Sequence, residues 1–413
     1  MPEPARRPER RAPARRAGVP ARAASTARTE RTARGVAIAA VVAAEEGARA
    51  NLELPRLLDA AALGPRDRAF ATELAYGTLR MLRACDWLVR QFARGDLEPR
   101  VRATACAGAY QLAYMRVPPY AAVAATVAES PARARPVVNA VLRRVADLVA
   151  AGPIPWPDLP TRLSYPDWVV GRLREDLGEE RALAALQEMN LAPPVSVRAD
   201  GYTQDLASQA VAAYMAGLLG RARPGTVLDM CAAPGGKATA LAPTVPLVVA
   251  ADIARPRAAL VAANARRLGL GNVAAVVADG TASPWAASQF AGVLVDAPCS
   301  GLGVLRRRPD ARWRVRAGDV ERLAGLQRRL LAAAAPLVTP GGLLVYSVCT
   351  LTRAETGDIG SWLAASLPAH QGWQPAPRPE GELPWEALGR GALLLPQAAG
   401  TDGMYVLALR RGS

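Results

Sequence analysis

Residues 225–252 read GTVLDMCAAPGGKATALAPTVPLVVAAD, and this stretch decides the fold. Two short apolar segments, each ending in an aspartate, predict buried strands, and a glycine-rich turn followed by a helix separates them. The same alternation of strand and helix continues to residue 349. It indicates an α/β domain with a doubly wound, Rossmann-like parallel sheet. Two later apolar segments, GALLLP (391–396) and MYVLALR (404–410), are expected to form edge strands.

The carboxyl ends of the predicted strands form the expected ligand site. Open α/β sheets bind ligands where the strand order reverses, which is between strands 1 and 4 of the order 3-2-1-4-5. The first three strands end at Asp229, Asp252 and Asp279. Three acids suit a nucleoside ligand without a triphosphate, because they would repel a polyphosphate. A phosphate-binding loop is excluded, because its motif requires glycine and Ser or Thr where this chain has Cys231 and Ala238.

Three of the five cysteines follow predicted strands: Cys231 follows strand 1, Cys299 follows strand 4 and Cys349 follows strand 5. They are expected to converge, because these strands are neighbours in the predicted order. Thiols beside a nucleoside cofactor suggest covalent catalysis on an electrophilic ring, but small buried hydrophobic residues are an equally good interpretation. The cysteines show no C-x-x-C spacing, and His370 is the only histidine. Neither disulfides nor a metal site are therefore expected.

The chain before the sheet is predicted to be helical. Apolar residues such as Phe70 and Leu74 recur there at helical spacing, and strand-like alternation is missing. Pro118 is expected to mark a boundary between two helices. The predicted organisation is a disordered basic tail (1–33), an all-helical domain (34–150), a linker with two short helices (151–200) and the α/β domain (201–413).

Length and charge bound the class of protein. The 413 residues are too many for one ordinary domain. No apolar run approaches the roughly 18 residues of a membrane helix, and no signal-peptide pattern is present, so a soluble cytoplasmic protein is expected. Residues 1–35 hold ten Arg and three Glu, which is +7 of the formal net charge of +15. Attraction to nucleic-acid phosphates would explain this tail, but so would a solubilising role or a start site assigned too early, and a transit peptide fits less well.

Four segments in the right order carry a resemblance to a known family. They are DMCAAPGGK (229–237), DAPCSGLG (296–303), RRRPDARW (306–313) and YSVCTL (346–351). They resemble the signature segments of the RsmB/Nop2/Sun family of RNA cytosine-C5 methyltransferases. DWLVRQF (86–92), AYQLAYMRVPPYAAVAATV (109–127) and VVNAVLRRV (137–145) are similar to the NusB-like RNA-binding domain of the bacterial RsmB branch.

The resemblance implies a cofactor, a substrate and residue roles. The methyl donor would be S-adenosylmethionine, and the substrate would be ribosomal RNA, with 16S rRNA expected. The catalytic thiolate falls on Cys349 and a helper cysteine on Cys299, while Asp296 would hold the edge of the cytosine. The implied cofactor-binding residues are Cys231, Ala232, Ala233, Pro234, Gly235, Gly236, Lys237, Asp252 at the ribose, Arg257, Asp279 at the adenine, and Asp296.

The chemistry explains why a thiolate is needed. Cytosine C5 is a poor nucleophile, so a thiolate must first add to C6 and create an enamine that attacks the sulfonium methyl group. The adduct must then lose the C5 proton and release the enzyme, which the second cysteine would assist. Arg306, Arg307 and Arg308 are expected to contact RNA phosphates.

One departure from the family concerns RNA binding. The small RNA-binding subdomain that the family carries before its QD-x-A-S-Q segment is missing, because SVRAD (196–200) continues directly into GYTQDLASQ (201–209). Three alternatives stay open: a non-catalytic NusB-like RNA-binding or antitermination-type protein, a methyltransferase for another RNA such as tRNA, and a DNA cytosine methyltransferase in which Cys299 would attack. A monomer with neither membrane nor metal partners is expected.

Overall fold

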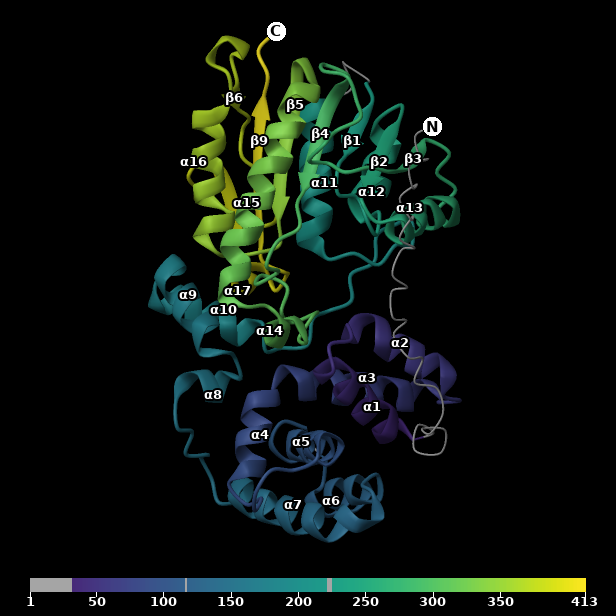
Figure 1. Cartoon of the computed structure of the whole chain (residues 1–413), viewed down its shortest axis with the longest axis vertical. Helices are drawn as coiled ribbons and strands as arrows, with labels where there is room; N and C mark the ends of the chain where they lie inside the picture. The colour runs from purple at the N-terminus through teal and green to yellow at the C-terminus, as the bar shows by residue number, and fades with distance from the viewer. Residues whose placement is uncertain (1–31, 116, 221–224) are drawn as a thin grey trace, which may run out of the picture.

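The computed structural model describes residues 32–115, 117–220 and 225–413. Figure 1 shows two halves stacked along the long axis, an all-helical half below and an α/β half above. The predicted fold class is therefore confirmed. The predicted basic tail lies outside the described residues except for Thr32 and Ala33, which begin the first helix. The Thr32 hydroxyl caps this helix by accepting a hydrogen bond from the amide of Gly35.

The helical half is built around one buried helix, α5. Its helices are α1 (Ala33–Glu45), α2 (Ala50–Ala60), α3 (Pro65–Arg80), α4 (Leu82–Arg90), α5 (Pro99–Ala113), α6 (Pro119–Ala128) and α7 (Arg135–Ala150). A Cβ added at Gly108 of α5 would lie 2.5 Å from Cδ1 of Leu142 in α7, and one at Gly77 of α3 would lie 2.1 Å from the Tyr110 ring in α5. Small residues therefore let α3 and α7 approach α5 closely. The start of α6 at Pro119 confirms the predicted boundary between helices.

Three short helices connect the halves. They are α8 (Leu159–Leu163), α9 (Asp167–Leu177) and α10 (Glu179–Glu188). The last two are the predicted pair of short helices. The first was not predicted and begins inside the proline-rich segment, because the carboxylate of Asp158 accepts a hydrogen bond from the amide of Thr161 at 2.6 Å and caps it.

The segment RRRPDARW joins the two halves through α14 (Ala311–Arg314). The side chain of Arg312 is fully buried, and its guanidinium group donates to the carbonyl oxygens of Arg80 at 2.8 Å and Ser164 at 3.0 Å. The same group lies 3.9 Å from the ring centroid of Tyr165. The indole N–H of Trp313 donates to the carbonyl of Leu79 at 2.7 Å. One short helix thus fastens the α/β half to the end of α3.

The sheet has the predicted order in its parallel part. The strands β3 (Val273–Val277), β2 (Val248–Asp252), β1 (Val227–Asp229), β4 (Phe290–Asp296) and β5 (Val338–Val348) lie side by side in this order. Beyond β5 the sheet continues with antiparallel β9 (Met404–Arg410), β8 (Gly391–Leu394) and β7 (Glu386–Leu388), while β6 (Gln374–Pro375) also pairs with β9. The switch point between β1 and β4 is where the sequence places it.

The expectation that 391–396 and 404–410 form edge strands is wrong. β9 lies between β5 and β8, and the edge strand beyond β8 is β7, which was not predicted. The reason is visible in the burial of β9, where every residue from Met404 to Leu409 is buried. A strand that is apolar at every position needs cover on both faces and on both sides, which an edge does not give.

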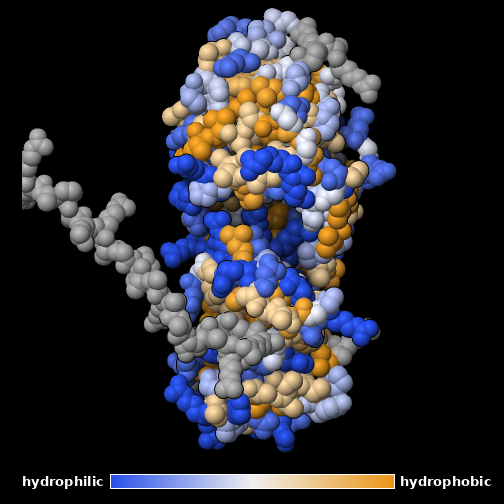
Figure 2. Space-filling view, turned by 90° about the vertical axis from the view of Figure 1, so that its right-hand side faces the viewer, coloured by the Kyte–Doolittle hydropathy of each residue, from blue (hydrophilic) through white to orange (hydrophobic). Residues whose placement is uncertain are grey.

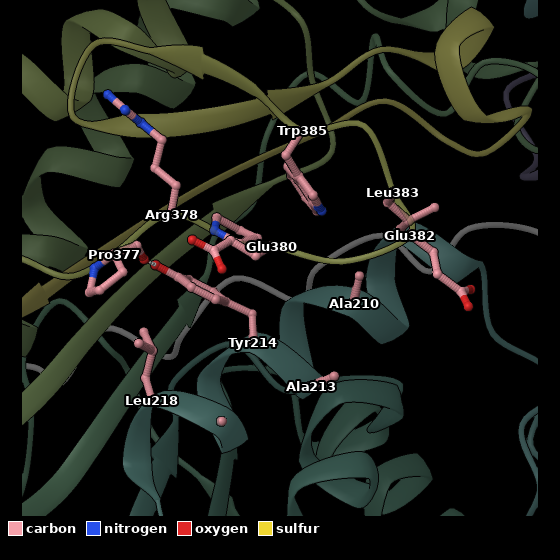
Figure 3. A pocket seen from close by; sticks show the side chains of 12 residues that line it. Ala210, Ala213, Tyr214, Leu218, Pro377, Arg378, Glu380, Glu382, Leu383 and Trp385 are labelled. Carbon is pink, nitrogen blue, oxygen red and sulfur yellow. Dashed lines mark hydrogen bonds between the residues drawn. The ribbon is translucent and has the colours of Figure 1, made fainter.

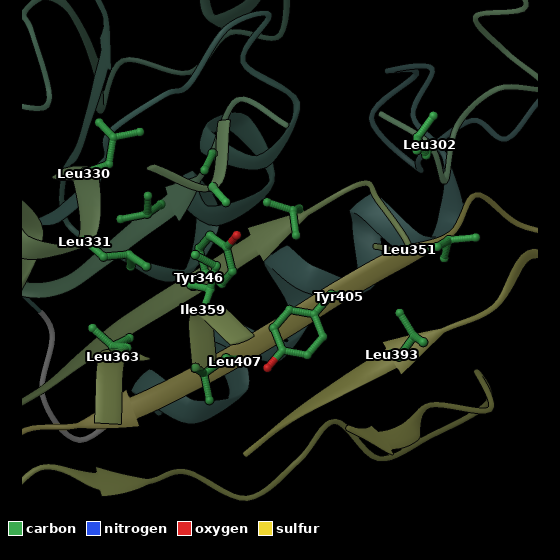
Figure 4. Close-up of a cluster of buried hydrophobic side chains, with 14 of the residues drawn as sticks. Leu302, Leu330, Leu331, Tyr346, Leu351, Ile359, Leu363, Leu393, Tyr405 and Leu407 are labelled. Atoms are coloured by element: carbon green, nitrogen blue, oxygen red, sulfur yellow. The ribbon is translucent and has the colours of Figure 1, made fainter. Parts of the chain in front are cut away.

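Helices cover both faces of the sheet. α15 (Ala317–Ala334) and α16 (Gly357–Ser366) cover one face, whereas α11 (Leu206–Leu219), α12 (Gly236–Leu241) and α13 (Arg255–Arg267) cover the other, and α17 (Pro396–Ala399) precedes β9. Figure 4 shows part of the core between the sheet and the face that α15 and α16 cover, where Leu330 and Ile359 come from the helices and Tyr346 and Tyr405 from the strands. No helix in the described ranges is both long and apolar enough to cross a membrane.

Candidate active site at the ends of β1, β4 and β5

Two of the three strand-end cysteines meet. Cys299 follows β4, Cys349 follows β5, and these strands are parallel neighbours. The two sulfur atoms lie 3.4 Å apart. Among the described residues Cys231, after β1, forms no hydrogen bond with either of these thiols, and burial together with the carboxylate of Asp229 raises the pKa of its own thiol. The predicted convergence is therefore confirmed for the pair that the resemblance made catalytic.

The two thiols differ in acidity. Their mutual hydrogen bond lowers the pKa of Cys349, against the effect of burial, and raises the pKa of Cys299. The positive charges of Arg308 and Lys237 also lower the pKa of Cys349, whereas burial and the carboxylate of Glu355 raise that of Cys299. Cys349 is thus the better thiolate, and Cys299 is the thiol that donates to it.

Asp296, the last residue of β4, stands next to this pair with fixed partners. Its Oδ2 accepts a hydrogen bond from Nζ of Lys237 at 2.7 Å, and its Oδ1 accepts one from Oγ of Ser347 at 2.7 Å. Burial disfavours the ammonium group of Lys237, but the carboxylate of Asp296 outweighs burial, so the pKa of Lys237 is raised. The side chain of Asp296 is 32% exposed. The only lysine of the chain therefore orients a carboxylate that a ligand can still reach.

The predicted cofactor loop, residues 231–237, forms the turn between β1 and α12. Gly235 has a φ of +103°, and a Cβ there would lie 3.2 Å from Cγ1 of Val261 in α13, so the position requires glycine. The side-chain amide of Asn264 donates to the carbonyl of Pro234 at 2.9 Å. α13 thus holds the turn from outside.

The remaining predicted cofactor residues lie at the ends of β2 and β3. Asp252 is buried, and its Oδ2 lies 3.2 Å from Nε of Arg257. A second nitrogen of Arg257 donates to the carbonyl of Ala233 at 3.0 Å. This arginine therefore connects Asp252, the acid that is predicted to bind the ribose, with the cofactor loop. Asp279 is exposed, and its carboxylate accepts hydrogen bonds from the amide and the hydroxyl of Thr281.

One buried carboxylate was not among the predicted cofactor residues. Asp229 ends β1 and is 1% exposed, and neither of its carboxylate oxygens has a hydrogen-bond partner among the described residues. Burial and the charge of Asp296 raise its pKa to about 7. Its place at the end of strand 1 was visible in the sequence, but only the packing shows that it faces the other acids without a partner.

In the region where the resemblance predicts that a subdomain is missing, residues 197–203 form a tight hairpin. Val197 and Thr203 form an antiparallel bridge, and the guanidinium group of Arg198 donates to the carbonyl of Gly236 at 2.6 Å and to the hydroxyl of Thr239 at 3.1 Å. The ring of Tyr202 lies 4.8 Å below the same guanidinium group. The shortened segment therefore packs on the start of α12, directly beside the cofactor loop.

The three consecutive arginines do not act together. Arg306 is buried and pairs with Glu188 at 3.1 Å, so the expectation that it contacts RNA phosphates is wrong. Arg307 pairs with Asp402 at 2.9 Å, which neutralises its charge inside the protein. Arg308 is exposed and acts on the pKa of Cys349. Only the third arginine keeps the geometry that phosphate contact requires.

Two further observations concern a cavity elsewhere in the α/β half and the grouping of side chains that could bind a metal ion. The cavity in Figure 3, about 730 Å³ in volume, lies between α11 and residues 377–385, where the Tyr214 ring extends toward Pro377, and no predicted site residue lines it. Within residues 32–115, 117–220 and 225–413, no group of three or more His, Cys, Asp or Glu side chains is placed to hold a metal ion.

Comparisons with known proteins agree with this geometry. Residues 217–410 match the model of the family described as 16S rRNA methyltransferase RsmB/F, and residues 31–147 match that of the NusB family. The chain is 37% identical to ribosomal RNA small subunit methyltransferase B of Thermus thermophilus, over 92% of this chain and 98% of that protein. It is 30% identical to the probable ribosomal RNA small subunit methyltransferase B of Bacillus subtilis, over 92% and 98%. A crystal structure of a protein designated PH0851 has the same fold, with a TM-score of 0.73 at 19% identity over 91% of this chain and 98% of that one.

Proposed function

We propose a function for this chain, which belongs to the RsmB/F family of 16S rRNA methyltransferases and carries an N-terminal domain of the NusB family. It methylates C5 of cytosine in 16S rRNA, and the reaction proceeds through a covalent bond between Cys349 and C6 of the base. The observation that carries the proposal is the pair of sulfur atoms 3.4 Å apart, in which the pKa of Cys349 is lowered and that of Cys299 is raised. A DNA-type enzyme would use Cys299 as the nucleophile, and its raised pKa opposes this alternative.

The residues present fit the cofactor of a methyltransferase. S-adenosylmethionine supplies a methyl group on a positively charged sulfonium. Asp229 has no hydrogen-bond partner among the described residues and adds a carboxyl group to the ion-paired Asp252 and Asp296, and this group can balance the charge of a cationic nucleoside. We assign the loop 231–237, Asp252, Arg257 and Asp279 to hold it.

The catalytic residues then have distinct tasks. The thiolate of Cys349 forms a bond to C6 of cytosine, which makes C5 nucleophilic toward the methyl group. Asp296, fixed by Lys237 and Ser347, accepts a hydrogen bond from the N4 amino group and so orients the ring. Transfer of the C5 proton to a water molecule lets the C6–S bond break and returns the thiolate, and the thiol of Cys299 assists this release from 3.4 Å by donating a hydrogen bond to the departing sulfur.

The arrangement of the two halves supports an RNA substrate. The carboxyl ends of the parallel strands point toward the helical half in Figure 1, and Figure 2 shows a hollow at the junction of the halves with hydrophilic side chains around it. We propose that the NusB-like half binds the RNA beside the target cytosine, which must leave its stack to reach a sulfur atom. We expect a monomer in the cytoplasm, where its ribosomal RNA is made.

The test of this function is to map 5-methylcytosine in 16S rRNA from a strain that lacks the gene. One or more cytosines should lose their C5 methyl group, and expression of the intact chain should restore it, whereas the Cys349→Ala variant should not. Loss of a mark from tRNA instead would assign the enzyme to another RNA. An unchanged 5-methylcytosine map in every RNA would contradict the proposed activity.

A further inference from the structure

A buried carboxylate behind the two cysteines has no task in the reaction described so far. Glu355 lies in the short turn between β5 and α16 and is 0% exposed. Among the described residues its carboxylate forms no ion pair, and the hydrogen bonds that it accepts come from neutral groups. A buried carboxylate is costly unless it is fully hydrogen-bonded, so the donors around it must be organised for it.

On one side this carboxylate holds the loop of Cys299. Its Oε1 accepts a hydrogen bond from the amide of Ser300 at 2.8 Å, and its Oε2 accepts one from the hydroxyl of Ser300 at 2.5 Å. The side-chain amide of Gln327, from α15, donates to Oε1 at 3.0 Å and to the carbonyl of Pro298 at 3.0 Å. Glu355 therefore holds the residue after Cys299 directly, and it holds the residue before Cys299 through Gln327.

On the other side the same carboxylate holds the loop of Cys349. The hydroxyl of Thr352 donates to Oε2 at 2.9 Å. The hydroxyl of Thr350 lies 3.2 Å from Oε2 and 2.8 Å from the hydroxyl of Ser300, and its single proton serves one of these two acceptors at a time. The residue that follows each cysteine thus has its hydroxyl at the carboxylate of Glu355.

We propose that Glu355 is the positioning residue that fixes the distance between the sulfur atoms of Cys299 and Cys349, through Ser300 and Thr350. The inference rests on the proposed function, in which these two sulfur atoms act in turn on one cytosine. Without the carboxylate, the donors of both loops lose a common acceptor, and the loops keep the Ser300–Thr350 contact, the contact between the two sulfur atoms and the hydrogen bond from the amide of Gly303 to the carbonyl of Cys349 at 3.0 Å. Displacement of a reacting group by about 1 Å is enough to cost about a hundredfold in rate.

The charge of Glu355 has a second effect on the pair. It raises the pKa of Cys299, whereas Glu355 is not among the main influences on the pKa of Cys349. The carboxylate therefore helps to keep Cys299 protonated while Cys349 ionises. Geometry and charge act in the same sense, because both favour a thiol that donates to a neighbouring thiolate.

The experiment compares Glu355→Gln and Glu355→Ala with the wild type. In protein without RNA, mass spectrometry follows the alkylation of Cys299 and Cys349 by iodoacetamide over a range of pH. Methylation of 16S rRNA is measured in parallel for kcat and KM. Glu73→Gln, which alters a hydrogen-bonded carboxylate in the helical half, is the matched control.

We expect Glu355→Ala to lower kcat by about a hundredfold with KM for RNA changed little, because positioning acts on the reacting atoms. Glu355→Gln keeps an acceptor for the Ser300 amide and should restore part of kcat, and Cys299 should become alkylated at lower pH than in the wild type. Glu73→Gln should match the wild type. If Glu355→Ala is alkylated and methylates as the wild type does, the proposal is overturned.

Two outcomes separate this inference from the proposed function. If no RNA is methylated by any variant or by the wild type, but alkylation of the cysteines changes in the Glu355 variants, the positioning role stands and the function is wrong. If Glu355→Ala does not fold, the double variant Ser300→Ala with Thr350→Ala replaces it, since it keeps the carboxylate and removes both hydroxyl links. Wild-type kcat in a folded double variant would then overturn the proposal.

Discussion

At the residue scale, the two cysteines make the same local environment serve two different tasks. They share one hydrogen bond, yet Arg308 and Lys237 favour the thiolate of Cys349, while Glu355 favours the thiol of Cys299. Chemistry that needs one nucleophile and one assistant can therefore use two identical side chains, because their neighbours carry opposite charges.

The first prediction concerns these two cysteines. Cys349→Ala should abolish methyl transfer and leave no covalent complex with RNA, because no other thiol has a lowered pKa here. Cys299→Ala should instead accumulate a covalent complex that survives a denaturing gel, because release is slowed while attack is not. An active Cys349→Ala beside an inactive, adduct-free Cys299→Ala would reverse the two roles.

The second prediction concerns the pH dependence of stability at Asp229. Its pKa is raised to about 7 in the folded protein, so between its ordinary value and pH 7 the folded state binds more protons than the unfolded state. The free energy of unfolding therefore falls as the pH rises through this window. Asp229→Asn should stabilise the cofactor-free protein by about 1–3 kcal/mol at pH 8, and by less at pH 5.

Thermal unfolding at pH 5 and pH 8, with and without S-adenosylmethionine, checks this. The stabilisation that the cofactor gives should be smaller in Asp229→Asn than in the wild type, because the variant has lost a negative charge at a cationic ligand. The same gain in stability at both pH values would show that Asp229 is not the titrating group.

At the scale of elements, the cofactor loop is held from two directions. α13 contacts it through Asn264 and Arg257, and the hairpin of residues 197–203 contacts the start of α12 through Arg198. A short turn between a strand and a helix has few backbone hydrogen bonds of its own, so neighbouring elements must fix its shape. The hairpin performs this task although the subdomain expected in this region is missing.

The third prediction follows for the hairpin. Arg198→Met should weaken the binding of S-adenosylmethionine about tenfold, because the carbonyl of Gly236 and the hydroxyl of Thr239 lose their partner beside the loop. Calorimetric titration measures the affinity, and circular dichroism checks the fold. Arg267→Met, which removes only a distant contact with the Tyr202 ring, serves as the control. Equal affinity in the Arg198 variant and the control would exclude this role.

At the scale of the whole molecule, the side chains of Arg312 and Trp313 in α14 join the two halves. Arg312 lies in the α/β half but donates to the carbonyl of Arg80 in the helical half and to Ser164 in the connection. Burial lowers its pKa to about 10, so it stays charged at neutral pH inside the interface. A buried cation therefore contributes to holding the helical half against the α/β half.

The fourth prediction is that Arg312→Ala separates the halves. The change leaves several carbonyl oxygens unpartnered in the interface and should cost about 1–3 kcal/mol of stability for each acceptor that finds no other donor. Calorimetry should then show two unfolding transitions where the wild type shows one. Methylation of 16S rRNA should fall more than binding of S-adenosylmethionine, whereas an equal loss of both would mean that the variant damages the α/β half itself.

The sequence by itself determined the parallel part of the sheet, the all-helical N-terminal half and the strand ends that carry the site. These features depend on local patterns: apolar runs that end in Asp229, Asp252 and Asp296, a glycine turn, and helical spacing. Strand order predicted that Cys231, Cys299 and Cys349 converge, because neighbouring parallel strands end at the same edge, and the structure brings the last two into contact.

Only the tertiary structure decided what depends on partners distant in the chain. The sequence cannot show that β9 inserts between β5 and β8, because pairing of strands is a long-range choice. The three arginines at 306–308 cannot be distinguished in the sequence, but packing against Glu188 and Asp402 leaves only Arg308 exposed. The acidity of each thiol and the network of Glu355 likewise arise from charges and donors that folding brings together, and no local pattern encodes such distances.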